Sequence, residues 1–138
     1  MTSDSIIKKV TEAAGDAAGV PVYHAPSPAA GEKIIYRFTP GGYDGEFETI
    51  TVIMRFISRD LAQAMKRAED VSGVICRRGE RGVDLGGEKF CGIREEGGGS
   101  GYIGKTGHFY VMSRFEIKFR RSCAERYVVV KPATESGM

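Results

Sequence analysis

The segment of this chain that most resembles a site for chemistry is the glycine-rich run Gly-Gly-Gly-Ser-Gly at residues 97–101. A glycine-rich loop binds phosphate when a helix follows it, because the first N–H groups of that helix then face the anion. Here an alternating strand pattern follows, and the run does not end in Gly-Lys-Ser/Thr. Ser100 also lacks the glycine that a nucleophile elbow requires two positions later, since residue 102 is tyrosine. The run is therefore interpreted as a mobile hairpin or assembly loop.

Metal-binding and nucleophilic side chains occur singly along the sequence, as His24, His108, Cys76, Cys91 and Cys123. Zinc sites usually take their ligands in close pairs, and an odd number of cysteines without a Cys-x-x-Cys spacing does not describe a disulfide framework. We therefore expect reduced, buried thiols, no metal and no cofactor. A cysteine–histidine nucleophile pair stays open as an alternative, because such pairs form in space rather than in sequence.

Two stretches of the sequence concentrate arginine, and together they make a candidate basic patch: Arg77, Arg78, Arg81, Arg120 and Arg121. Guanidinium groups fork onto phosphate oxygens, so the pattern is compatible with nucleic-acid binding. The net charge is only +2, however, and the negative end of a preceding helix would stabilise Arg77 and Arg78 without any ligand. Nucleic acid is therefore not the expected partner, and a small basic RNA-binding module is kept as an alternative.

The 138 residues suffice for one domain with a hydrophobic core, since 41% of them are apolar and 28% are charged. Residues 1–9 contain no continuous apolar run of the kind that a signal peptide needs. No segment approaches the roughly 20 apolar residues that cross a bilayer. We expect a soluble protein with no membrane partner. Residues 1–131 are predicted to form the single domain, and residues 132–138 a disordered C-terminal tail.

Two long strands give the strongest structural signal. Between residues 108 and 119 apolar and polar side chains alternate, which is the period of a strand with one buried face. Residues 46–57 form the second strand, and its residues Ile50, Val52, Met54 and Phe56 share one face. Its other face is partly apolar as well, so we expect a central position in a sheet. A strand at residues 33–38 precedes it, and residues 40–45 are predicted as the turn of the resulting hairpin.

A main helix is predicted after the second long strand, beginning after Ser58 or Asp60. Asp60 and Gln63 have the spacing of a capping box. The predicted apolar stripe of this helix is Leu61, Met65, Ala68, Val71 (or Ser72) and Ile75, and its predicted solvent side is Lys66, Arg67, Glu69 and Asp70. We expect the helix to lie across one face of the sheet. The fold class is therefore α+β, with a mostly antiparallel or mixed sheet, one main helix packed on one face and an N-terminal helix.

The remaining segments complete the order of elements. Apolar residues at 3.6-residue spacing predict the N-terminal helix, which Ser3 or Asp4 caps and Gly19 ends. The other predicted elements are strands at residues 20–23, 83–85 and 88–95, a loop with two prolines at residues 25–31, and an edge strand at residues 126–131.

This order of elements resembles the tail terminator and minor capsid (tail completion) proteins of long-tailed bacteriophages. The resemblance rests on Lys-Ile-Ile-Tyr-Arg-Phe at residues 33–38, Thr-Ile-Thr-Val-Ile-Met-Arg-Phe-Ile at residues 49–57 and the helix at residues 58–70. It continues with Gly-Gly-Ser-Gly-Tyr-Ile at residues 98–103 and the strand at residues 109–117, and it covers roughly residues 6–120.

What the resemblance implies is an α+β structural protein of a phage or prophage virion. Such a protein caps the tail tube and joins tail to head as a ring, which in this family is a hexamer. Its implied partners are further copies of itself, a tail-tube protein and a head connector protein. Its implied location is the virion and, during assembly, the cytoplasm of the bacterial host. The resemblance carries over no catalytic residues. Another phage neck or head–tail joining protein is the alternative, and an enzyme is the less favoured one.

Long strands with exposed edges supply ring contacts when they add to the sheet of a neighbour. Two glycine-containing segments are predicted to stay flexible in the monomer and to become ordered on docking. The residues predicted to contact a neighbouring subunit or the tail tube are Gly41, Gly42, Tyr43, Asp44, Gly97, Gly98, Gly99, Ser100 and Gly101.

Overall fold

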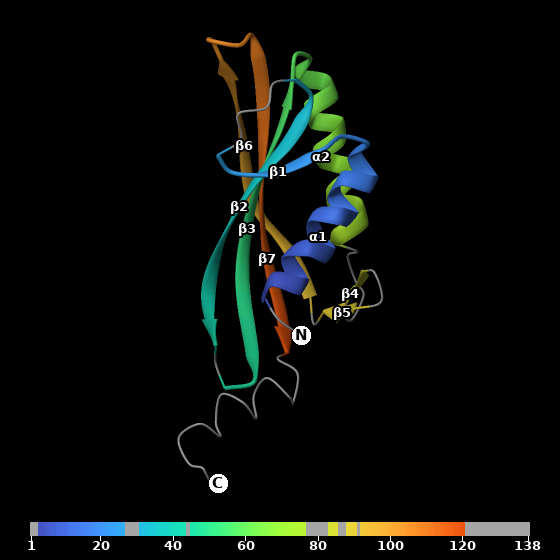
Figure 1. The fold of residues 1–138 in the computed structure, drawn as a ribbon, viewed down its shortest axis with the longest axis vertical. Helices are drawn as coiled ribbons and strands as arrows, with labels where there is room; N and C mark the ends of the chain where they lie inside the picture. Colours follow the sequence, from blue (N-terminus) through green and yellow to red (C-terminus); the bar gives the residue numbers. More distant parts are fainter. Residues whose placement is uncertain are drawn as a thin grey trace, which may run out of the picture.

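The computed structural model describes residues 3–26, 31–43, 45–76, 83–85, 88–90 and 92–120. The elements in these ranges are α1 (Ser3–Ala18), β1 (Val22–His24), β2 (Lys33–Tyr43), β3 (Phe47–Ser58), α2 (Leu61–Ile75), β4 (Val83–Leu85), β5 (Glu88–Phe90), β6 (Gly92–Ile103) and β7 (His108–Arg120) (Figure 1). The predicted strand at residues 126–131 and the predicted tail at residues 132–138 lie outside the described residues.

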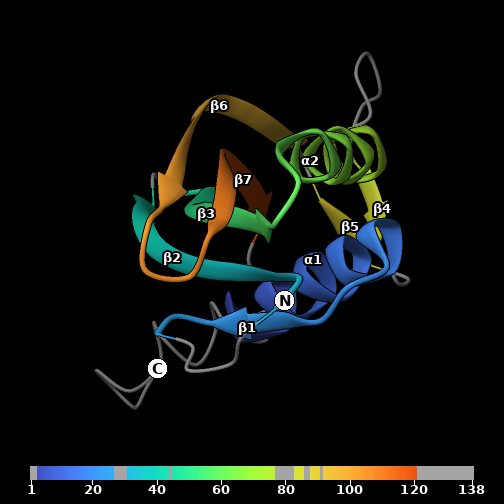
Figure 2. The same ribbon diagram turned by 90° about the horizontal axis from the view of Figure 1, so that it is seen from above.

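A five-stranded sheet with the order β1-β2-β3-β7-β6 forms the centre of the fold, and β4 pairs with β5 in a separate two-stranded sheet. β1 runs parallel to β2, whereas the other neighbours are antiparallel. Both helices lie on the same side of the larger sheet (Figure 2). The predicted α+β class with a mixed sheet is therefore confirmed. We call the face that the helices cover the inner face, and the opposite one the outer face.

The core lies between the inner face of β3 and β7 and the two helices. The predicted face of β3 is fully buried from Ile50 to Phe56 at alternate positions, and Phe115, Ile117 and Phe119 of β7 lie beside it. Each such side chain contributes about 1.5–3 kcal/mol through burial. The β7 residues that alternate with them point to the outer face, where Arg114 and Lys118 are exposed and Glu116 is half-buried. The alternation predicted for residues 108–119 and the central position of β3 are thus confirmed.

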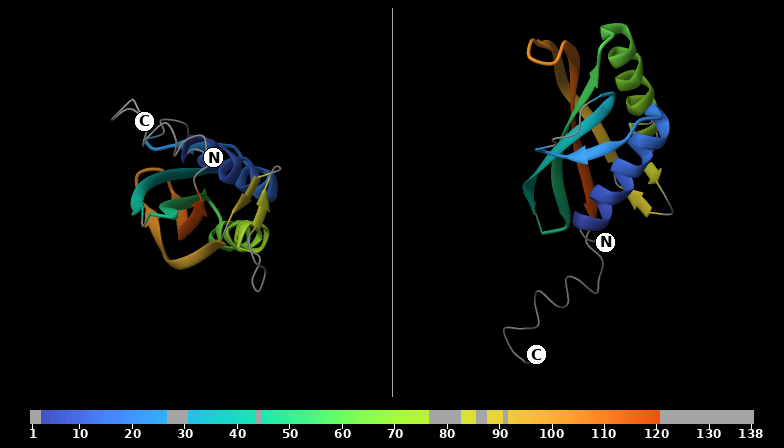
Figure 3. Two further views of the ribbon diagram at one scale, coloured as in Figure 1. Left: turned by 90° about the horizontal axis from the view of Figure 1, so that it is seen from below. Right: turned by 45° about the horizontal axis from the view of Figure 1, so that its top comes forward.

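α1 packs against α2 and closes the core from one end, as the turned view shows (Figure 3). Its residues Ile6, Val10 and Ala14 are completely buried, in agreement with the predicted helical spacing. The helix ends at Gly19, as predicted. Gly19 adopts a φ of 71°, and its N–H donates to the Gly15 carbonyl at 2.8 Å. A left-handed residue of this kind is favourable for glycine and closes the last helical turn.

The buried side of α2 consists of Ala64, Ala68, Val71 and Ile75. The predicted stripe is therefore right at its last three positions but wrong at Met65, whose side chain is 50% exposed. Residues 64, 68, 71 and 75 follow the spacing of one helical face, whereas residue 65 lies about 100° further round the axis. A small alanine, rather than the larger methionine, brings the helix close to the sheet.

β2 extends to Tyr43, so the turn predicted at residues 40–45 is wrong over most of its length. The pairing of β2 with β3 shifts between Pro40 and Gly42, and this irregularity accommodates the proline. β1 pairs only with Ile34–Tyr36, so Pro40 lies where the opposite side of β2 has no partner strand among the described residues. The predicted strand at residues 88–95 is likewise divided, because β5 ends at Phe90 and β6 begins at Gly92.

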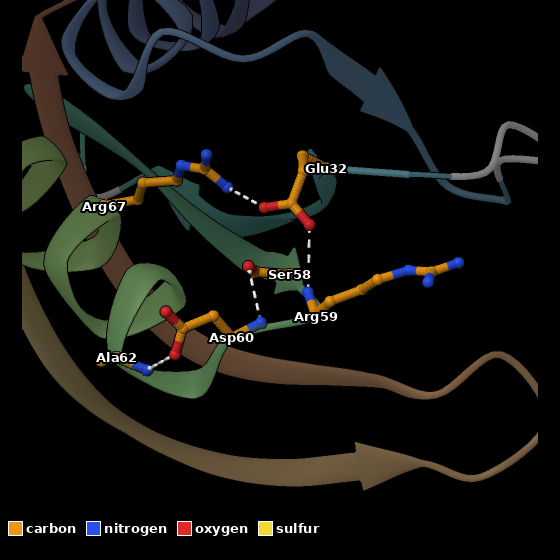
Figure 4. A network of polar contacts seen from close by, with 6 residues as sticks. All are labelled: Glu32, Ser58, Arg59, Asp60, Ala62 and Arg67. Carbon is orange, nitrogen blue, oxygen red and sulfur yellow. Dashed lines mark hydrogen bonds and ion pairs between the residues drawn. The ribbon is translucent and has the colours of Figure 1, made fainter.

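A chain of hydrogen bonds fixes the start of α2 (Figure 4). Asp60 is the N-cap, and its Oδ1 accepts from the Ala62 N–H at 3.0 Å. Ser58 Oγ accepts from the Asp60 N–H at 3.0 Å, so Ser58 takes the role that the capping-box prediction gave to Gln63. The predicted N-cap is confirmed, whereas the predicted box is wrong. Side-chain caps of this kind stabilise a helix by about 1 kcal/mol.

Glu32, directly before β2, ties α2 to the sheet. Its Oε1 accepts from Arg67 Nη1 at 2.6 Å, and its Oε2 accepts from the Arg59 N–H at 3.0 Å (Figure 4). The prediction that Arg67 faces solvent is wrong, because its side chain is only 15% exposed. Burial acts to raise the pKa of Glu32, but hydrogen bonds from Ser58, Arg67 and the Arg59 N–H outweigh it and hold this pKa below its ordinary value of 4.5.

Glu32→Gln should lower the free energy of unfolding at neutral pH by about 1 kcal/mol, because the largely buried Arg67 loses its charged partner while water screens part of the effect at the more exposed Glu32. A carboxylate with a depressed pKa stabilises the fold above its unfolded pKa and loses that contribution as the pH falls through its folded pKa. The difference between wild type and variant should therefore shrink below pH 4.5. Urea denaturation at several pH values measures it.

The matched control for this comparison is Asp70→Asn, which removes the exposed Lys66–Asp70 pair of α2. That pair is a surface pair one helical turn apart, so its loss should cost no more than about 0.5 kcal/mol. Equal stability of the Glu32→Gln protein and the wild type at neutral pH would contradict the role given to Glu32.

Candidate assembly surfaces

The glycine-rich run is a strand. Residues 97–101 lie in β6 and pair with β7, from Gly97 opposite Arg114 to Gly101 opposite Tyr110. The prediction of a mobile loop is therefore wrong. The turn of this hairpin lies further along the chain, where the Gly107 N–H donates to the Ile103 carbonyl at 3.0 Å. Backbone pairing needs no side chain, so a continuous ladder to β7 orders glycines that have little intrinsic preference for a strand.

Two glycines of β6 are required by close approach of β7. A Cβ atom on Gly98 would lie 2.4 Å from the Met112 carbonyl oxygen, and one on Gly101 would lie 2.5 Å from the Tyr110 ring. The Tyr110 ring thus lies across the backbone of β6 where a side chain is missing. Gly99 differs from both, because its missing Cβ would meet open space. The pairing within the hairpin therefore explains Gly98 and Gly101 but not Gly99.

β6 is an edge strand of the sheet. Among the described residues it pairs with β7 alone, so its other side presents unpaired N–H and C=O groups over twelve residues. Exposed edges of this length are open to pairing with another chain unless they are covered. The part of β2 beyond Tyr36 is a second such edge.

A groove of about 420 Å³ runs between α2 and β6. Met65 and Glu69 of α2 line one side, Glu95 and Gly99 of β6 line the other, and Val111 of β7 contributes to the floor. The groove is wide here because glycines occupy the part of β6 that faces the helix. Glu95 Oε1 accepts from Ser72 Oγ at 2.8 Å, which links α2 to β6 across the groove. We call this surface the α2/β6 groove.

The outer face carries exposed arginines that the predictions did not single out. Arg37 of β2 and Arg114 of β7 both lie opposite Ile53 of β3, so the three side chains form one row across the sheet. Arg55, two residues after Ile53, lies on the same face, 5.4 Å from the Tyr110 ring centroid. Period-2 spacing places each residue on a face of its own strand, but only the register between strands brings the three arginines together.

The other predicted contact segment lies at the opposite end of the sheet. Gly42 and Tyr43 end β2 beside Thr49 and Glu48 of β3, whereas the β6–β7 turn is at the far end of the molecule (Figure 1). Tyr43 is 41% exposed, and its hydroxyl donates to the Gly45 carbonyl at 2.9 Å. Asp44 lies outside the described residues. The structure therefore does not bring the two predicted contact segments together.

Of the predicted basic patch, Arg77, Arg78, Arg81 and Arg121 lie outside the described residues. Arg120 ends β7, where its Nη2 lies 2.9 Å from a Glu46 carboxylate oxygen and its guanidinium lies 5.1 Å from the Phe47 ring centroid. Its charge is therefore balanced locally.

The described residues contain no group of three or more His, Cys, Asp or Glu side chains able to hold a metal ion. His24 stacks on Tyr36 with ring centroids 4.9 Å apart, and His108 is buried at the first position of β7, the strand-end position predicted for it. Cys76 is half-buried after α2, and Cys91 and Cys123 lie outside the described residues. Within the described ranges no helix is both long and apolar enough to cross a membrane.

Comparison with known proteins is informative at the level of the fold. No protein-family model matches the sequence, and no match is found among curated proteins. Among solved structures, the fold is similar to a chain of the virion of a native gene transfer agent particle, with a TM-score of 0.58 and 16% sequence identity. The match covers 81% of this chain and 92% of that chain. At this identity the likeness concerns the fold.

Gly98→Ala should lower the free energy of unfolding by about 1–3 kcal/mol, because its Cβ meets backbone of β7 that cannot move aside without breaking the ladder. The matched control is Gly99→Ala in the same strand, where the Cβ points into open space. We expect that change to be neutral or stabilising by a few tenths of a kcal/mol. Urea denaturation of both variants measures the difference. Equal effects of the two substitutions would contradict the assigned strand register.

Proposed function

We propose that this protein is a structural component of a phage or phage-derived virion. The observation that carries the proposal is the likeness of its fold to a chain of the gene transfer agent virion, which extends over 92% of that chain. The resemblance of residues 6–120 to tail terminator proteins, drawn from the order of elements, points in the same direction. The sequence pattern and the three-dimensional fold thus support the same class of particle.

Within the virion, we assign the protein to the end of the tail, where it caps the tail tube and joins it to the head. It acts there as a ring of identical copies, with a tail-tube protein on one side and a head connector protein on the other. A closed ring needs heterologous contacts, in which two different surfaces of the subunit meet. The edge of β6 and the outer face, which no strand or helix of the described residues covers, are two such surfaces.

The proposed role is structural rather than catalytic. An enzyme places a few polar groups together in a deep, largely apolar pocket. Three hollows among the described residues are instead open at the surface: glycines and two carboxylates line each of two of them, and two arginines without a carboxylate line the third. A surface of this kind suits contact with another protein.

The purified chain should assemble into annular particles when it is concentrated. Negative-stain electron microscopy shows the particles, and sedimentation velocity over a dilution series measures their mass. A gel-shift assay with RNA and duplex DNA, at low and moderate salt, tests the alternative RNA-binding module, whose affinity would be strongly salt-dependent. A protein that stays monomeric at the highest soluble concentration and binds RNA in this way would contradict the proposed role.

A further inference from the structure

The outer face of the sheet carries a cluster of uncompensated positive charge. It consists of Arg37, Arg55 and Arg114, which are all exposed and which we call the basic strip. Within the described part of the chain none of the three makes an ion pair, whereas Arg94 and Arg120 do. Glu116, in the next row of the sheet, is bound to Arg94 at 2.8 Å and is therefore not available to the strip.

Apolar side chains surround the basic strip. Ile53 lies between Arg37 and Arg114, and Arg55 lies between Ile35 and Met112 in the adjoining row. Beside them is a hollow of about 280 Å³, whose lining includes Arg37 and Arg55 together with Pro26. Charged groups set among apolar ones on a rigid sheet are typical of a surface that another protein covers, because desolvation strengthens the pairing of the charges.

The α2/β6 groove has the opposite charge. Its lining includes the carboxylates of Glu69 and Glu95 and contains no lysine or arginine. Glu95 is held in place by Ser72, and Glu69 is exposed and makes no ion pair with any described residue. Met65, half exposed at the rim, and Val111 at the floor give the groove an apolar surface as well. The groove and the basic strip are thus complementary in charge, and both surfaces include apolar side chains.

The two surfaces also have the arrangement that a ring requires. α2 lies on the inner side of the sheet (Figure 2), and the groove opens beside it. The register of the strands places the basic strip on the opposite face. Two basic strips repel one another, so a symmetric strip-to-strip dimer is disfavoured and a head-to-tail contact is favoured. We propose that the basic strip of one copy docks into the α2/β6 groove of the next; this inference rests on the proposed ring.

The chemistry of arginine suits such a contact. Its aliphatic stem packs on methionine side chains, and its guanidinium group forks onto a carboxylate with two parallel hydrogen bonds. The groove offers partners for both parts of the side chain, because the exposed Met65 lies at its rim and the carboxylates of Glu69 and Glu95 line it. The occupant of the groove is accordingly a second copy of this chain.

The test uses two full-length variants with reversed charges. Arg37→Glu with Arg114→Glu makes the strip acidic, and Glu69→Arg with Glu95→Arg makes the groove basic. Each variant alone should assemble at least about tenfold more weakly than the wild type, because like charges then face each other at every contact. An equal mixture of the two should recover assembly, since each strip then meets a groove of opposite charge. Sedimentation velocity measures the assembly.

Arg59→Glu is the matched control, because this exposed arginine is not among the residues that line the groove or form the basic strip. Its backbone N–H donates to Glu32, and its side chain extends away from Glu32 and Arg67 (Figure 4). It should assemble like the wild type. Circular dichroism and urea denaturation establish that every variant is folded.

Rings that form in all variants alike would overturn this inference and leave the proposed ring standing. If the wild type slows the migration of duplex DNA in a gel and the strip variant assembles normally but no longer does so, the basic strip binds nucleic acid and this inference is overturned. A wild-type protein without any self-association would overturn both proposals.

Discussion

One-sided burial of the five-stranded sheet is the constraint on which the rest of the structure depends. The inner faces of β3 and β7 supply Met54, Phe56 and Phe115, which are completely buried against the helices. An amphipathic helix has only one apolar stripe, so two helices packed together suffice to cover one face of this sheet. The Glu32–Arg67 contact holds α2 at this position. As a direct consequence, none of the helices and strands in the described ranges covers the outer face or the free edge of β6.

The elements that could be predicted from the sequence are those whose side chains repeat with a clear period. β7 and β3 were found because apolar residues alternate along them, and α1 because its buried residues recur on one helical face. The part of β6 from Gly97 on was missed, since glycines at residues 97–99 and 101 show no alternation, although the predicted strand at residues 88–95 includes the first residues of β6. Arg67 was misplaced because its partner Glu32 is 35 residues away. Met65 was placed in the core on its hydrophobicity, although Ala64 occupies the buried position.

One segment that borders the candidate site was singled out from the sequence, but a different structure was predicted for it. The segment 97–101 does border an open surface, but as an ordered edge strand rather than as a loop that folds on docking. An ordered edge loses less conformational entropy on association than a flexible loop does. The basic strip depends on the register of three strands, in which Ile53 separates Arg37 from Arg114, and single-sequence patterns do not give register. A virion subunit built in this way would present two rigid, oppositely charged surfaces.

Hydrogen exchange of the backbone amides, measured by mass spectrometry on dilute and on concentrated wild-type protein, tests most directly whether the uncovered sheet surfaces are the assembly surfaces. The account predicts that concentration slows exchange in β6, along the edge away from β7, and leaves the exposed side of α1 unchanged. Slowed exchange confined to α1, with β6 exchanging equally fast at both concentrations, would contradict it.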